Sequence, residues 1–97
     1  MANNIQSFAE DFSYDSEEVA WVSNSMPFSQ DIYMTMTLTS PGKVVIRQSN
    51  DGEKWERVPL KRHKDTSSFQ FRFDIREPMN IRVYTSTQPK EAKYAYI

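Results

Sequence analysis

The residues that could carry chemistry are few and scattered along the chain. General acid–base catalysis most often employs histidine, and the one histidine, His63, lies in the basic run Lys61-Arg62-His63-Lys64. Like charges on both sides should keep this side chain exposed and away from a carboxylate partner. We therefore expect neither a catalytic nor a metal-binding role for His63.

Carboxylate pairs are the next candidates. Glu53 with Glu56, and Asp11 with Asp15, could serve as acid and base or hold a hard cation. Such pairs are common on any solvated surface, and no glycine-rich phosphate loop, nucleophile elbow or zinc-binding helix accompanies them. The chain has no cysteine, which excludes thiol chemistry and disulfides. We predict no catalytic residue, no metal and no cofactor; a small enzyme would need a pocket that this sequence does not reveal.

A cationic stretch could instead follow a phosphate backbone. Its members are Arg57, Lys61, Arg62, Lys64, Arg72 and Arg76. The neighbouring phenylalanines alternate with polar residues and so belong to a core, and the formal charge of −1 gives no general attraction to nucleic acid or to an anionic membrane. We expect a solvated loop, or a patch for the acidic N-terminal segment, and no nucleic-acid or membrane partner.

The elements that must position these residues are short β-strands. Over residues 69–75 and 32–39, apolar side chains alternate with polar ones, which is typical of strands with one buried face. Both glycines, Gly42 and Gly52, fall where the alternation breaks, beside residues that favour turns. These turns predict a meander of three strands over residues 31–39, 43–49 and 53–60.

Further strands are expected over residues 19–22, 69–75, 79–87 and 92–97, which brings the count to about seven. Seven short strands with frequent turns are the pattern of an immunoglobulin-like or fibronectin III-like sandwich. We predict an all-β fold, a single antiparallel β-sandwich over residues 19–97. An open barrel or a small jelly roll would fit the same pattern, because strand order along the chain does not fix the pairing.

Residues 1–18 form an acidic arm with five carboxylates and no basic residue. Ile5, Phe8, Ala9 and Phe12 share one helical face, so the arm is predicted to contain a short helix. Two roles stay open: the arm folds back on its own sandwich, or it docks on a neighbouring subunit.

Exposed aromatic side chains are the most useful hint of function. Tyrosine joins apolar area to a hydroxyl group and therefore suits both protein interfaces and sugar faces. Cross-strand packing alone would also place tyrosine on a sheet. The candidate interaction residues are Ile5, Phe8, Phe12, Tyr33, Arg72, Arg82, Tyr84, Tyr94 and Tyr96.

Residues 45–58 carry a recognisable hairpin. Ser49-Asn50-Asp51-Gly52-Glu53-Lys54-Trp55 between two strands resembles the S-x-D-G-x-x-W turn of discoidin-like and fibronectin-like β-sandwiches. Asp51-Gly52 would make the tight reversal, and Trp55 would close the turn end of the core. The resemblance implies the fold and supplies no ligand site.

These observations favour a non-enzymatic structural or assembly module. The N-terminus has neither a basic region nor a continuous apolar stretch, so we expect synthesis in the cytoplasm without a signal peptide. A sandwich of a type common outside cells, made without an export signal, fits a virion component such as a capsid decoration, tail or fibre protein. Its partners would be proteins, with homo-oligomers included. The alternative is a carbohydrate-binding module that uses surface tyrosines on a glycan.

Overall fold

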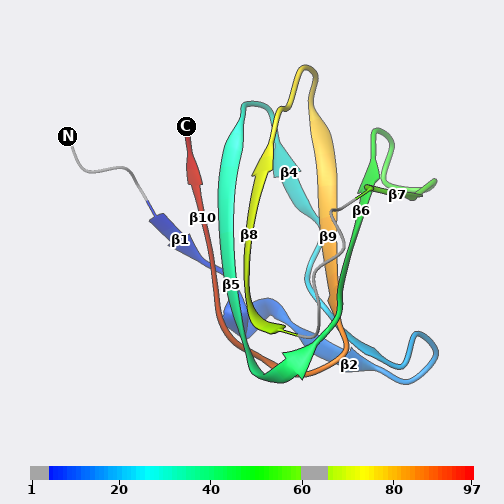
Figure 1. Cartoon of the computed structure of the whole chain (residues 1–97). Helices are drawn as coiled ribbons and strands as arrows, with labels where there is room; N and C mark the ends of the chain where they lie inside the picture. Colours follow the sequence, from blue (N-terminus) through cyan, green and yellow to red (C-terminus); the bar gives the residue numbers. More distant parts are fainter. Residues whose placement is uncertain (1–4, 60–65) are drawn as a thin grey trace.

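Two antiparallel sheets pack face to face in the computed structural model, which describes residues 5–59 and 66–97. Sheet A has the strand order β1 (Ile5–Ser7), β10 (Pro89–Tyr96), β5 (Ile32–Gly42), β8 (Thr66–Phe73). Sheet B has the order β2 (Ser13–Asp15), β3 (Ala20–Val22), β9 (Met79–Thr85), β6 (Val44–Ser49), β7 (Glu56–Arg57), and β4 (Met26–Phe28) also pairs with β9. The all-β prediction is confirmed (Figure 1).

Strands at increasing distance in sequence from the turn between β6 and β7 pair with one another across that turn. β6 pairs with β7, β5 with β8, β4 with β9 and β1 with β10, so the chain forms one long antiparallel ribbon. Rolling this ribbon places β10 beside β5 and β9 beside β6, which completes the two sheets. Nested pairing of this kind is the plan of a jelly roll. The immunoglobulin plan distributes its strands as ABED and CFG instead.

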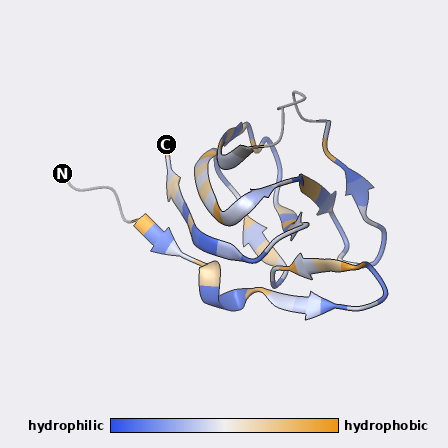
Figure 2. Ribbon diagram, turned by 60° about the horizontal axis from the view of Figure 1, so that its bottom comes forward, coloured by the Kyte–Doolittle hydropathy of each residue, from blue (hydrophilic) through white to orange (hydrophobic). Residues whose placement is uncertain are grey.

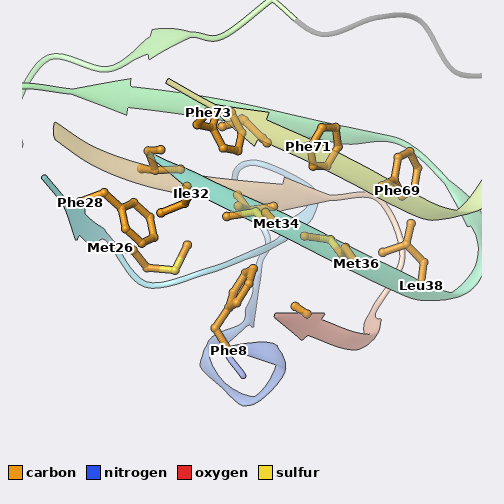
Figure 3. Packing of buried hydrophobic residues seen from close by; sticks show 14 residues of the cluster. Phe8, Met26, Phe28, Ile32, Met34, Met36, Leu38, Phe69, Phe71 and Phe73 are labelled. Atoms are coloured by element: carbon orange, nitrogen blue, oxygen red, sulfur yellow. The ribbon is translucent and has the colours of Figure 1, made fainter. Parts of the chain in front are cut away.

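The core lies between the two sheets and is built by the alternation seen in the sequence. Ile32, Met34 and Met36 of β5 are at most 2% exposed, while Tyr33 between them points to the other side. β8 lines up with β5 in register, so its phenylalanines face the same core (Figure 3). Figure 2 shows the alternation of hydropathy along the strands. Burial of these side chains is the main stabilising contribution to a domain of this size.

The predicted meander over residues 31–60 is half right: its second hairpin forms, since β6 pairs with β7, but the pairing of its first two strands is wrong. β5 and β6 are consecutive in the chain but belong to different sheets, and one residue, Lys43, separates them. The chain therefore turns a corner at Gly42, where a Cβ atom would lie 2.5 Å from the Ser86 hydroxyl oxygen. Proline and glycine mark such a corner and a hairpin alike, so the sequence could not separate them.

The predicted N-terminal helix is also wrong. Residues 5–15 form β1, a single 3-10 turn (Ala9–Asp11) and β2, and the described residues contain no helix that is long and apolar enough to cross a membrane. Phe8 is 2% exposed, whereas Ile5 is 65% exposed, so the supposed apolar stripe is divided. Free edges of β10 and β3 offer backbone partners to this segment, while a short isolated helix is marginal in water.

Candidate binding face

The structure distributes the nine candidate residues over three places. The outer face of sheet A has Ile5, Tyr33 and Arg72; the outer face of sheet B has Arg82 and Tyr84; and an aromatic cluster at the margin of the sandwich has Phe8, Phe12, Tyr94 and Tyr96. Three separate surfaces therefore need to be weighed.

The outer face of sheet A surrounds one tyrosine with polar side chains. Tyr33 is 40% exposed, and its hydroxyl donates a hydrogen bond to Gln70 Oε1 at 2.9 Å. Arg72 lies directly opposite Tyr33 and pairs with Asp74 at 3.5 Å, with both side chains more than half exposed. Such exposed pairs contribute little to stability. This face offers one ordered ring with polar neighbours.

The marginal aromatic cluster is mainly structural. Tyr94 packs against Phe8 and Phe28, with ring centroids 5.9 Å and 4.9 Å away. Burial raises the pKa of Tyr94, and the neighbouring Tyr96 and Asp11 add to the effect. Tyr94 and Tyr96 pair with the buried residues Met34 and Ile32 of β5 and so lie on the core side of sheet A. The expected exposure is therefore wrong for Tyr94, which is partly buried, whereas Tyr96 at the end of the strand is 36% exposed.

The outer face of sheet B carries a row of three arginines. Arg57 of β7 lies opposite Arg47 of β6, and Arg47 lies opposite Arg82 of β9. Directly paired residues point to the same side of an antiparallel sheet, and the adjacent pair Ile46 and Val83 is fully buried, so the three arginines point outward. We call Arg57, Arg47 and Arg82 the arginine row. Like charges placed opposite each other in a sheet are destabilising.

Aromatic rings pack on two of the three arginines. The guanidinium carbon of Arg82 lies 4.5 Å from the centroid of the Trp55 ring, and that of Arg47 lies 4.4 Å from the Tyr84 ring. Stacking of this kind stabilises a cation by its attraction to the face of the ring. Arg47, Arg57, Arg82, Trp55 and Tyr84 together form what we call the aromatic–arginine face.

Two predictions about these rings are wrong. Tyr84 does not stand free on the surface, since it is 8% exposed beneath Arg47. Trp55 does not close the core: it is absent from the buried cluster and stacks on Arg82 at the outer surface. In both cases the guanidinium group of an arginine packs on the aromatic ring. Interpreted only as charges, these arginines give no indication of this contact in the sequence.

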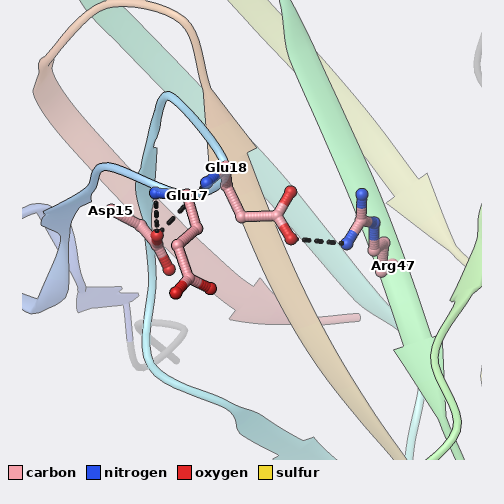
Figure 4. Close-up of polar contacts among 4 residues, drawn as sticks. All are labelled: Asp15, Glu17, Glu18 and Arg47. Carbon is pink, nitrogen blue, oxygen red and sulfur yellow. Dashed lines mark hydrogen bonds and ion pairs between the residues drawn. The ribbon is translucent and has the colours of Figure 1, made fainter.

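Glu18 adds a carboxylate to this face. Its Oε1 lies 3.4 Å from a terminal nitrogen of Arg47, with both side chains partly exposed. Glu18 belongs to the turn between β2 and β3 and reaches across β9 to β6 (Figure 4). The turn is held by Asp15, whose carboxylate accepts the backbone N–H groups of Glu17 and Glu18 at 2.9 Å and 3.2 Å.

The loop before β7 positions Trp55. Asp51 Oδ1 accepts the backbone N–H groups of Lys54 and Glu53 and the Ser49 hydroxyl, at 3.0 Å, 2.8 Å and 3.0 Å. These donors lower the pKa of Asp51, with the Lys54 N–H as the largest cause. Gly52 has a φ of 79°, which glycine adopts without strain. Hydrogen bonds to Asp51 therefore hold this loop in one shape, and its tryptophan faces outward.

The cationic stretch does not form one patch. Arg57 lies in sheet B and Arg72 in sheet A, on opposite outer faces. His63, with Lys61, Arg62 and Lys64, lies outside the described residues. The sequence does not identify Arg47, Trp55 and Glu18 as members of a shared surface. For Arg47, the alternation of residues in its strand could have indicated an outward-facing side chain.

Guanidinium groups beside aromatic rings are chemically suited to pair with anions and to pack on planar groups. Within residues 5–59 and 66–97, no cluster of three or more histidine, aspartate or glutamate side chains is arranged to hold a metal ion. Comparison of the chain with protein-family models, with curated proteins and with solved structures gave no match.

Proposed function

We propose that this protein is a non-enzymatic assembly module that binds a protein partner through the aromatic–arginine face. The observation that carries the proposal is the arginine row on one outer surface, with Trp55 packed on Arg82 and the buried Tyr84 supporting Arg47 from beneath. The few residues that dominate the binding energy of a protein interface are enriched in tryptophan, tyrosine and arginine. An interface also explains why like charges stand opposite each other at a cost to stability.

The setting that we propose is a larger particle, such as a virion, with the chain as a capsid auxiliary, tail or fibre component. Jelly rolls are recurrent in viral capsid proteins and in lectins. This support is an analogy between folds, so it bears on the class of function and does not identify the partner. Association with further copies of the same chain is one form that such an assembly would take.

Site-specific photo-crosslinking tests the proposal. A photoreactive residue at position 57 lies on the aromatic–arginine face, and one at position 35 lies on the opposite outer face of the sandwich. In cells that make the native assembly, we expect one predominant crosslinked protein from position 57 and little from position 35. Equal crosslinking from both positions, or crosslinking from position 35 alone, would contradict the proposal.

Carbohydrate binding is the second candidate, and the outer face of sheet A favours it. Tyr33 presents a partly exposed ring whose hydroxyl is fixed by Gln70, with Thr35 beside it. Sugar-binding faces combine such a ring with polar groups. A glycan array with the wild-type chain and the Tyr33→Ala variant decides this candidate: binding that the variant loses supports it, and no binding by the wild type removes it.

A further inference from the structure

We propose that the arginine row is a binding site for a carboxylate-rich segment of a partner protein, and that Glu18 occupies part of this site until the partner arrives. The inference rests on the proposed function and names the chemistry of the partner. It also gives Glu18 a role, that of an internal competitor.

The arginine row is spaced and oriented for more than one carboxylate. Neighbouring strands lie about 4.8 Å apart, so Arg57, Arg47 and Arg82 extend over about 10 Å across the sheet. The guanidinium carbons of Arg82 and Arg47 lie over the rings of Trp55 and Tyr84. An aromatic ring neutralises no charge and accepts no conventional hydrogen bond, so the guanidinium groups keep the capacity to pair with carboxylate oxygens.

The row carries an electrostatic cost without a ligand. Arg47 lies between two like charges, those of Arg57 and Arg82. An anion bound along the row would offset this repulsion by pairing with the terminal guanidinium nitrogens.

Glu18 indicates which anion fits. Its carboxylate pairs with Arg47 at 3.4 Å, longer than the 2.7–2.9 Å of a strong charge-assisted bond. The two side chains are 35% and 42% exposed, so the contact is weak and can be exchanged. Among residues 5–59 and 66–97, Glu18 forms an ion pair with Arg47, and neither Arg57 nor Arg82 has a carboxylate oxygen within 4.0 Å, which leaves capacity for carboxylates from outside.

The test is calorimetric titration of the full chain with a peptide of about ten residues that alternates glutamate and serine, at low ionic strength. Arg57→Gln should weaken binding about three- to tenfold, because a charge-assisted contact is lost. Arg72→Gln is the matched control, with the same charge change on the opposite face, and should leave the affinity unchanged. Glu18→Gln should strengthen binding about two- to fivefold by removing the competitor.

Several results would overturn the inference. One is absence of peptide binding by the wild type. This result would overturn the inference even if another anion, such as a sulfated oligosaccharide, bound to the row. Another is equal weakening by Arg57→Gln and Arg72→Gln, which would indicate general charge attraction. A third is self-association, seen by light scattering, that Arg57→Gln abolishes, since the occupant would then be a second copy.

The two proposals fail separately. Crosslinking from position 57 without peptide binding would keep the assembly function and reject the carboxylate-rich partner. Peptide binding with the expected variant pattern, without crosslinking from position 57, would keep the anion site and reject the assembly function.

Discussion

Replacement of Phe8 by alanine tests whether the N-terminal segment belongs to the sandwich. Phe8 is 2% exposed, its ring packs on Phe12 and Tyr94 at 5.7 Å and 5.9 Å, and its N–H donates to the Ala92 carbonyl at 2.8 Å. Truncation of a buried phenylalanine to alanine costs about 3–5 kcal/mol. A small domain is stable by about 5–15 kcal/mol, so the variant should lose a large share of its stability.

The assay is urea unfolding followed by circular dichroism, with Ile5→Ala as control. Ile5 comes from the same segment but is 65% exposed, so its truncation should cost less than about 0.5 kcal/mol. At about 4–8 °C per kcal/mol for a domain of this size, Phe8→Ala should also lower the melting temperature by at least about 12 °C. If Phe8→Ala unfolds within about 0.5 kcal/mol of the wild type, the segment is not packed as described, and a free docking arm regains support.

Two further changes probe the polar contacts that shape the fold. Ser23→Ala should destabilise the chain by about 1–3 kcal/mol in urea unfolding, because the buried Ser23 hydroxyl accepts the Val83 N–H at 2.9 Å; a change below about 0.5 kcal/mol would contradict that contact. Asp51 has a pKa below its ordinary value of 3.8, so its ionised form contributes stability that is present above about pH 4 and lost as the pH falls through the folded-state pKa. The stability advantage of wild type over Asp51→Asn should therefore shrink between pH 7 and pH 3, and an advantage that grows on acidification would refute this assignment.

Alternation was the part of the fold that the sequence could predict. The apolar members of residues 32–38 and 69–73 form the core as expected, because side-chain direction in a strand depends only on the chain itself. The corner at Gly42 and the nested pairing depend on contacts between distant residues, which order along the chain does not reveal. The N-terminal segment showed a helical spacing, but unpaired edges of two sheets decided its conformation.

The candidate site could be predicted only in part, for the same reason. Arg82 and Tyr84 were expected on a solvent face from their alternation with Ile81 and Val83, and both do lie on the outer side of sheet B. That Arg47 stands opposite Arg82 is a matter of register between strands 35 residues apart in sequence. A one-residue shift in register would turn these side chains to the other face.

The outward position of Trp55 was equally beyond the sequence. A tryptophan after a tight turn is usually assigned to the core because of its large apolar surface. Here its stacking partner is Arg82, whose planar group packs on an aromatic face as well as an apolar side chain does. A large aromatic residue close to a strand that carries arginine can therefore pack on either side of the sheet, in the core or on an outward-facing guanidinium group.

Competition between variants during assembly tests the central claim most directly. Arg57→Gln and Arg72→Gln remove the same charge from edge strands on opposite outer faces. Each variant would be produced together with an equal amount of wild type in the native host, and the ratio of the two chains in the purified assembly would be measured by mass spectrometry. We predict that Arg57→Gln is depleted and that Arg72→Gln is incorporated equally with wild type. Equal incorporation of Arg57→Gln, or depletion of Arg72→Gln instead, would contradict the assignment of the aromatic–arginine face as the binding surface.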